Sequence, residues 1–356
     1  MNVVASEILG MVTCASLLAV LLALLERAVR IWRIPAEASR KAVHVGGGLA
    51  CLALPFLLDT VTAVAALAVL FSAVLFAGER RGALRSLSGV RRESTGSFYF
   101  PVAVLLVYMI AGERTWLYVT SLLVLAVADS AAALIGKGYG RIHYTLGDGA
   151  TKSLEGSLFF WLTAFLAVHL PLLLLTDVDR SVCVLAALLT ATLLSFAEAV
   201  SIRGLDNIFV PVLTCYILLL ITTKPPEEVL YQCVSLLALT ALLVGVGRGL
   251  RLLTLQNCLF LVLFTYAVWA LGTHRWAIPV LVVLATCAVA ALRRQVRRPL
   301  PLTSDALLPA LIPPLLILLA ANSTELFSLF FPAFLIAVLA PGVIGLRQLR
   351  RMSRRA

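Results

Sequence analysis

Asp129 is a carboxylate inside an apolar stretch that is long enough to cross a membrane. The stretch leads directly into a glycine-rich segment that contains Gly136, Lys137 and Gly140. Placing an ionised side chain in hydrocarbon costs about 3 kcal/mol or more, so such a residue needs a partner and usually has a function. A metal ligand, a general base and a structural ion pair between helices would each explain Asp129.

A second polar segment follows, with glycines at 147 and 149 and with Lys152, Ser153 and Glu155 close behind. Glycine N–H groups next to a lysine and hydroxyl groups are suited to binding phosphate oxygens. The segment is not a Walker A loop, because Thr151 stands before the lysine where that motif has glycine. Short turns between helices are also rich in glycine, so both a phosphate site and a simple connection fit the pattern.

Two earlier clusters have the same character. Lys41 and His44 come just before three consecutive glycines, and both could contact phosphate,. Basic residues also flank membrane segments on the cytoplasmic side, which would explain Lys41 without any ligand. Glu93, Ser94 and Ser97 begin another apolar run, where they could face a nucleotide or could only cap a helix,.

The last cluster joins two apolar runs. Glu198 ends one run, and Asp206 and Asn207 begin the next. Asp206 could be a helix cap and Glu198 an acid at the membrane interface. Together with Asp129, however, these acids would suit a magnesium-bound nucleotide, because proteins typically hold Mg²⁺ through one or two carboxylates plus phosphates.

The elements that must position these residues are membrane helices. The chain is 61% hydrophobic and only 13% charged, with a mean hydropathy of +1.02. Apolar runs of about twenty residues recur throughout. We predict an all-α polytopic integral membrane helical bundle of about thirteen transmembrane helices, at 8–25, 43–58, 60–77, 98–111, 116–135, 154–175, 181–199, 207–223, 229–245, 252–272, 275–292, 305–321 and 324–344,.

The basic residues predict the orientation. Of 29 Lys and Arg residues, 25 fall in the segments that follow odd-numbered spans. The positive-inside rule then places the N-terminus outside and the C-terminus in the cytoplasm. Every polar cluster described above falls on the cytoplasmic side, although none was used to derive the orientation. We therefore predict one composite site where a cytosolic nucleotide meets a substrate dissolved in the bilayer.

The same reasoning excludes several classes of protein. The net charge of +11 mainly reflects topology, so a nucleic-acid partner is not expected,. The seven cysteines are scattered singly through apolar runs, which indicates neither a disulfide framework nor a zinc site,. The polar clusters end near residue 225. We predict a catalytic membrane domain over 1–225 with about eight spans and an accessory region over 226–356 with about five.

Five short motifs occur in a fixed order over roughly residues 38–215. They are Arg40-Lys41-x-x-His44, Glu93-Ser94-x-Gly96-Ser97, Asp129-x-x-Ala132-x-x-x-Gly136-x-x-x-Gly140, Lys152-Ser153-Leu154-Glu155-Gly156-Ser157, and Glu198 followed by Asp206-Asn207 and Pro211. This ordered set resembles the CTP-dependent lipid kinases, a family that includes dolichol kinase, phytol kinase and a CTP-using diacylglycerol kinase. Ala128 departs from the family, which commonly has glycine before the aspartate, and the spans after residue 225 lie outside the resemblance.

The resemblance implies an integral membrane kinase that moves the γ-phosphate of CTP to the hydroxyl of a membrane isoprenoid alcohol at the cytoplasmic face. Dolichol or another polyprenol is the first expectation, with phytol, geranylgeraniol and diacylglycerol as alternatives. The membrane would be the plasma membrane in a prokaryote and the endoplasmic reticulum in a eukaryote, and the oligomeric state stays open.

On this interpretation Mg²⁺ is the cofactor and CTP the phosphate donor. Asp129, Lys152 and Glu198 would be catalytic, and Asp129 and Asp206 would hold the metal. The residues expected to bind the nucleotide and its phosphates are Lys41, His44, Glu93, Ser94, Ser97, Gly136, Lys137, Gly140, Ser153, Glu155, Asp206 and Asn207.

Two other functions fit parts of the pattern. A cytidylyltransferase that makes a CDP-lipid also has an aspartate and a glycine-rich, lysine-containing stretch beside a span, but its late aspartate-rich signature is missing here. A secondary transporter or lipid flippase could have this many spans and use Asp129 as an ion site. Transporters usually place polar residues near the midplane in both halves, whereas here they gather at one face of one half.

Overall fold

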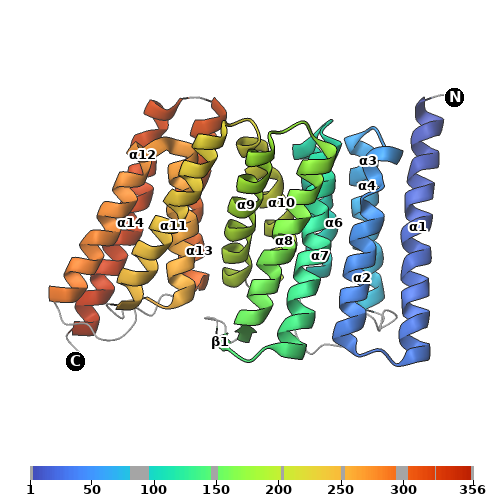
Figure 1. Cartoon of the computed structure of the whole chain (residues 1–356), viewed down its shortest axis with the longest axis horizontal. Helices are drawn as coiled ribbons and strands as arrows, with labels where there is room; N and C mark the ends of the chain where they lie inside the picture. Colours follow the sequence, from blue (N-terminus) through green and yellow to red (C-terminus); the bar gives the residue numbers. More distant parts are fainter. Residues whose placement is uncertain are drawn as a thin grey trace. The chain divides into compact units, whose positions relative to one another are not determined.

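The computed structural model of the chain is a set of long helices (Figure 1). It describes residues 3–80, 96–145, 151–201, 204–249, 253–293, 304–324 and 326–353. Within those ranges the only strands are β1 (His143–Thr145) and β2 (Thr151–Ser153), which form a two-stranded sheet. Helices dominate because a chain in hydrocarbon must satisfy its backbone hydrogen bonds internally. The predicted all-α polytopic membrane fold is confirmed.

Two compact units make up the structure. The first comprises Met1–Tyr144 and Thr151–Val229, and the second contains Leu230–Ala356. The boundary predicted from the sequence was near residue 225. The first unit contains α1 (Val3–Trp32), α2 (Ala36–Cys51), α3 (Leu54–Leu57), α4 (Val61–Arg80), α6 (Gly96–Ala111), α7 (Thr115–Tyr139), α8 (Leu154–Leu175), α9 (Arg180–Val200), α10 (Asp206–Ile221) and the start of α11 (Pro226–Gly249).

Helix α7 is at the centre of the first unit, where it packs against α2, α6, α8 and α10. Small residues allow close approach to two of these neighbours. A Cβ atom on Gly48 of α2 would lie 2.6 Å from the Cβ of Ala126, and one on Gly156 of α8 would lie 2.9 Å from the carbonyl oxygen of Ala132. Small residues are the usual means of packing helices in lipid, where the hydrophobic effect does not drive association. This packing fixes the position of Asp129 on α7.

The second unit is built from most of α11 together with α12 (Leu255–Arg293), α13 (Ser304–Thr324) and α14 (Phe327–Ser353). Residues of α12, α13 and α14 share a buried apolar cluster. Its members are Phe264, Val268, Trp276, Val280, Leu318, Ala321, Phe334 and Val338. Trp276 is central to it, with its ring 4.7 Å from that of Phe334, centroid to centroid.

The structure differs from the predicted spans in two places. The span predicted over 43–58 is divided, because α2 ends at Cys51 and the short α3 follows it. We expected separate helices over 252–272 and 275–292, but α12 continues through both as one helix of 39 residues. The segments Leu255–Gly272 and Arg275–Ala290 remain distinct as apolar stretches. Thr273, His274 and Arg275 interrupt the hydrophobicity, but these residue types are compatible with a helix. The polar residues therefore predicted a break between two helices that is absent from the structure.

Seven apolar stretches of the described helices are long enough to cross a membrane, and five further apolar stretches, one of them the second part of α12, are shorter. In the first unit, successive long helices run in opposite directions (Figure 1). The ends of α1, α7 and α9 and the starts of α2, α8 and α10 therefore lie at the same end of the unit. All the candidate site residues that the structure describes belong to these segments, to the start of α6 or to the hairpin beside them. The number of crossings and the orientation stay predictions.

Cysteine labelling would test that orientation. We expect Glu113→Cys, in the connection between α6 and α7, to react with a membrane-impermeant maleimide in intact cells, because positive-inside topology places this connection outside. Tyr139→Cys, at the opposite end of α7, should react only after the membrane is permeabilised. Both parent side chains are exposed, and the unmodified protein measures labelling of the native cysteines. The reverse pattern would overturn the predicted orientation.

Candidate active site

Lys41 and Asp129 form an ion pair between α2 and α7. The Nζ atom of Lys41 lies 2.5 Å from Oδ2 of Asp129, and it also approaches the backbone carbonyl oxygen of Asp129 at 3.4 Å. The Lys41 side chain is 6% exposed and that of Asp129 is 14% exposed. Each charge thus has an opposite charge in a region from which water is largely excluded. The sequence singled out both residues but did not predict that they pair.

His44 lies about one turn after Lys41 on α2 and approaches the same carboxylate. Its Nε2 atom is 3.6 Å from Oδ2 of Asp129 and 3.2 Å from the backbone carbonyl oxygen of Leu125. A carbonyl oxygen only accepts hydrogen bonds, so the tautomer with hydrogen on Nε2 suits this position. The ring of Phe100 meets the imidazole edge-on, with the centroids 5.6 Å apart. His44 is therefore held in place beside Asp129.

A second ion pair joins the hairpin to the C-terminal end of α9. Lys152 of β2 donates to Oε1 of Glu198 at 2.6 Å and also to the backbone carbonyl oxygen of Glu198. Burial lowers the pKa of Lys152, but the Glu198 carboxylate, together with Asp206 and Tyr144, more than offsets this effect, so the pKa lies above its usual value,. Lys152 is therefore a cation at any physiological pH. The partial negative charge at the end of α9 acts in the same direction.

Asp206 lies between these two pairs. It begins α10 and interacts electrostatically with Asp129, Lys152 and Lys41. Its Oδ1 atom is buried and has no hydrogen-bond partner among the described residues. A buried carboxylate oxygen without a partner is energetically costly, so each such atom calls for an explanation such as a bound ion. Asn207, the next residue, is buried as well.

The charges of the cluster fit a bound cation. Two lysines and the nearby Arg40 face three carboxylates, those of Asp129, Glu198 and Asp206, so the cluster carries no excess positive charge that would repel a cation when His44 is neutral. No group of three or more His, Cys, Asp or Glu side chains among the described residues is arranged to hold a metal by itself. Nucleotide-bound Mg²⁺ needs only one or two carboxylates, and phosphates and water supply its other ligands. Asp206 and Asp129 fit that requirement.

Tyr144 and Ser157 belong to the same region but were not among the predicted site residues. The Tyr144 hydroxyl of β1 lies 2.7 Å from the Ser157 hydroxyl of α8. Burial raises the pKa of the Tyr144 phenol, and the nearby Glu198 carboxylate adds to this effect. The phenol is therefore neutral and can donate a hydrogen bond. The only sequence signal was the position of Ser157 at the end of the fourth motif, because Tyr144 lies in an otherwise unremarkable loop.

Gly136 and Gly140 have a packing role at the contact between α7 and α8. A Cβ atom on Gly136 would lie 2.9 Å from Oγ of Ser153. One on Gly140 would overlap the carbonyl oxygen of Gly136 and lie 2.7 Å from the Cβ of Ser153. Ser153 caps α8, because its Oγ accepts the N–H of Gly156 at 3.1 Å. The glycines thus let the hairpin carrying Lys152 sit against α7, and their contact with phosphate stays a prediction.

We expect Gly140→Ala to lower the free energy of unfolding by about 1–3 kcal/mol, the usual cost of overpacking. Gly138→Ala is the matched control, because a Cβ atom there would meet nothing within 4 Å. Thermal unfolding in detergent measures both variants. Equal free energies of unfolding for the two variants would show that the contact between Gly140 and Ser153 leaves room for a methyl group.

Several predicted residues lie away from the cluster or outside the described structure. Glu155 accepts a hydrogen bond from the backbone N–H of Ile142 at 3.2 Å, so its carboxylate supports the hairpin. Lys137 is exposed near the end of α7. Glu93 and Ser94 lie outside the described residues, as does the side chain of Ser97. Their predicted contacts with nucleotide stay predictions.

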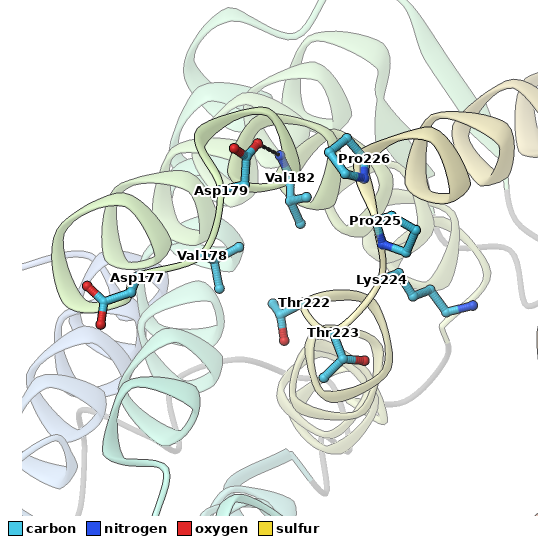
Figure 2. A pocket seen from close by; sticks show the side chains of 9 residues that line it. All are labelled: Asp177, Val178, Asp179, Val182, Thr222, Thr223, Lys224, Pro225 and Pro226. Carbon is cyan, nitrogen blue, oxygen red and sulfur yellow. Dashed lines mark hydrogen bonds between the residues drawn. The ribbon is translucent and has the colours of Figure 1, made fainter.

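A pocket of about 600 Å³ opens at the other end of the first unit (Figure 2). The connections from α8 to α9 and from α10 to α11 line it. Two of its three charged side chains are already engaged. Asp179 caps α9 by accepting the backbone N–H of Ser181 at 2.8 Å, and Lys224 pairs with Glu228. The third, Asp177, is exposed to solvent, unlike the buried carboxylate oxygen of Asp206.

Comparison with known proteins gives two relatives. The chain is 34% identical over 184 residues to a phytol kinase from Synechocystis sp., covering 50% of the chain and 76% of that protein. It is 32% identical over 120 residues to a dolichol kinase from Saccharomyces cerevisiae, covering 31% of the chain and 22% of that protein. The chain belongs to the phytol and dolichol kinase family. The resemblance inferred from the ordered motifs is confirmed.

The family assignment rests on sequence similarity to these enzymes. No family model matches the chain, and no solved structure matches it. The alignment spans about three quarters of the phytol kinase but only about a fifth of the dolichol kinase. Half of the present chain lies outside the longer alignment. Together with the apolar helices, the comparison makes this chain an integral, multi-pass membrane protein of a lipid kinase family.

Proposed function

We propose that this protein transfers the γ-phosphate of CTP to the hydroxyl of a membrane isoprenoid alcohol, with the site at the cytoplasmic end of the first unit. One observation carries the proposal within the family. Two lysine–carboxylate pairs flank Asp206, whose buried Oδ1 atom has no partner among the described residues. Phosphoryl transfer depends on positioning and charge neutralisation more than on covalent chemistry, and this cluster offers both.

The first step is an exchange of ionic partners. The phosphates of an arriving nucleotide attract Lys41 and Lys152, which are paired with Asp129 and Glu198 before it binds. As each lysine turns toward a phosphate oxygen, its carboxylate loses a cation. Bound Mg²⁺ would be held by Asp206 and Asp129 and would neutralise charge on the phosphates. The lysines then stabilise the charge that spreads over the transferred group.

Asp129 is the residue best suited to accept the proton of the alcohol. Once Lys41 turns to a phosphate, the Asp129 oxygen that it occupied is free to accept the proton, while the other oxygen would contact the metal,. His44 keeps the carboxylate oriented during that exchange. The neutral Tyr144 hydroxyl, paired with Ser157, is a hydrogen-bond donor that can orient the acceptor alcohol near Lys152.

The identities of the alcohol that accepts the phosphate and of the nucleotide that donates it are the most specific parts of the proposal. The named substrates of the relatives, phytol and dolichol, are both isoprenoid alcohols. The fuller coverage of the phytol kinase favours an alcohol of phytol's size, while a dolichol or polyprenol remains the alternative that motif order alone suggested. CTP as the donor rests on the motif resemblance.

The test uses purified protein in detergent with Mg²⁺ and γ-labelled CTP. The alcohols are phytol, geranylgeraniol, a polyprenol, dolichol and diacylglycerol, and unlabelled ATP, UTP and GTP serve as competitors. We expect label on an isoprenoid alcohol, with CTP outcompeting the other nucleotides. Label from α-labelled CTP on the lipid would instead identify a cytidylyltransferase. If an alcohol bound to the protein but received no labelled phosphate from CTP, the proposed CTP-dependent kinase activity would be contradicted.

A further inference from the structure

A row of ring-bearing side chains continues from the site into the membrane along α8. Ser157, Trp161, Phe165 and His169 are four residues apart, so they lie on one face of the helix,. The rings are stacked. The planes of Trp161 and Phe165 differ by 12° with centroids 6.0 Å apart, and those of Phe165 and His169 differ by 11° at 5.4 Å. The row is thus a continuous apolar surface that begins at the Tyr144–Ser157 hydroxyl pair.

The row lies at the contact between α8 and α9. Trp161 donates its indole N–H to the Thr192 hydroxyl of α9 at 3.1 Å, which fixes the direction of its ring. All three rings are half-buried, whereas the neighbouring Leu162 and Leu166 on α8 are exposed. The row therefore runs between the packed interior and the exposed side of α8, where a membrane-dissolved chain can reach it.

His169 makes the far end of the row unusual. It is an ionisable residue inside a candidate membrane span, and its buried Nδ1 atom has no hydrogen-bond partner among the described residues. Ionisable residues inside membrane helices usually have a function. At 1.5 Å per residue, His169 lies about 18 Å along α8 from Ser157. That length can accommodate several isoprene units.

We propose that the isoprenoid chain of the substrate lies along Trp161 and Phe165, with its hydroxyl at Ser157 and Tyr144, and that His169 limits the favoured chain length. This inference rests on the proposed function, since it places the tail of the same alcohol. A chain that ends before His169 covers only apolar rings. A longer chain also covers the half-buried imidazole of His169 and removes its remaining accessible polar edge from water, which is unfavourable,.

Kinetics with alcohols of increasing length provide the first test. With geraniol, farnesol and geranylgeraniol as acceptors, Phe165→Ala should raise KM about tenfold for the longest alcohol and progressively less for the shorter ones, because only the longer chains reach its ring. His169→Phe should raise kcat/KM about tenfold for polyprenols longer than the row, by replacing the polar edge of the imidazole with an apolar ring. Leu166→Ala, on the exposed side of α8, should change neither quantity. A Phe165→Ala effect that is equal for all lengths would overturn the proposal.

Photo-crosslinking separates this inference from the kinase proposal. A geranylgeraniol analogue with a diazirine at its far end is irradiated with the full-length protein in detergent, without nucleotide. Mass spectrometry should find the label on α8 or α9 near Phe165 and His169, and excess phytol should remove it. Label found only elsewhere would overturn the inference even if the kinase assay succeeds. Label at this position without phosphorylation of any alcohol would support binding of the isoprenoid chain along the row, and it would contradict the proposed kinase activity.

Discussion

Asp129→Asn should reduce lipid phosphorylation by about a thousandfold, within the usual range for losing a general base. The substitution removes a proton acceptor and a proposed metal ligand, while the amide keeps nearly the same size. The measurement is the initial rate of label transfer from γ-labelled CTP to the preferred alcohol. Phytol binding should be much less affected, because the row on α8 does not include this residue.

Stability must be controlled in that experiment. Losing Asp129 leaves Lys41 as a buried cation with its main partner gone, which typically costs about 3–5 kcal/mol. The double variant Lys41→Gln with Asp129→Asn removes both charges, so its thermal stability in detergent should recover much of that loss. Its activity should not recover. If activity returned with stability, Asp129 would be a structural ion-pair partner only.

Lys152→Gln should lower kcat/KM for CTP by about a hundredfold to a thousandfold, as expected when one preorganised positive group is removed from a transferring phosphoryl group. Lys152 is held by two oxygens of Glu198 and keeps its charge throughout the physiological range. The loss should appear in kcat as well as in KM, because the charge on the phosphoryl oxygens changes during transfer.

Two variants distinguish the charge of Lys152 from its packing. Lys152→Arg keeps a cation and should retain more activity than the glutamine variant. Glu198→Gln removes the carboxylate but keeps the backbone carbonyl oxygen that also accepts from Lys152, so we expect a smaller loss than for Lys152→Gln. If the two single variants lost activity equally, Glu198 would have a direct role in transfer, as the sequence suggested, in addition to holding the lysine.

Much of the candidate site could be predicted because alternate connections of a membrane protein lie on the same side. Lys41, Asp129, Lys152, Glu198 and Asp206 were expected at one face, and the structure gathers them at one end of the first unit. Their partners could not be predicted. Lys41 and Asp129 are 88 residues apart in the chain, and only the packing of α2 on α7 brings their side chains together.

Residue type alone left the interpretation open where one type serves several purposes. Glycines next to a lysine suggested a phosphate loop, but Gly136 and Gly140 are also needed for the close contact with Ser153. Glu155 belonged to a motif, yet its carboxylate accepts a backbone N–H of the hairpin. Tyr144 was missed because a tyrosine in a loop has no distinctive spacing, and its contact with Ser157 depends on how the hairpin folds onto α8.

The sequence predicted that the chemistry lies in the first 225 residues or so, and by itself it determined that this protein is a bundle of membrane helices. Composition suffices for that conclusion, because hydrocarbon tolerates few charges and requires helices that satisfy their own backbone. Only the tertiary structure decided which charges pair and that Asp206 keeps an oxygen without a partner among the described residues. It also decided which face of α8 carries the row from Trp161 to His169. These features depend on the rotation and contacts of packed helices, which residue order does not encode locally.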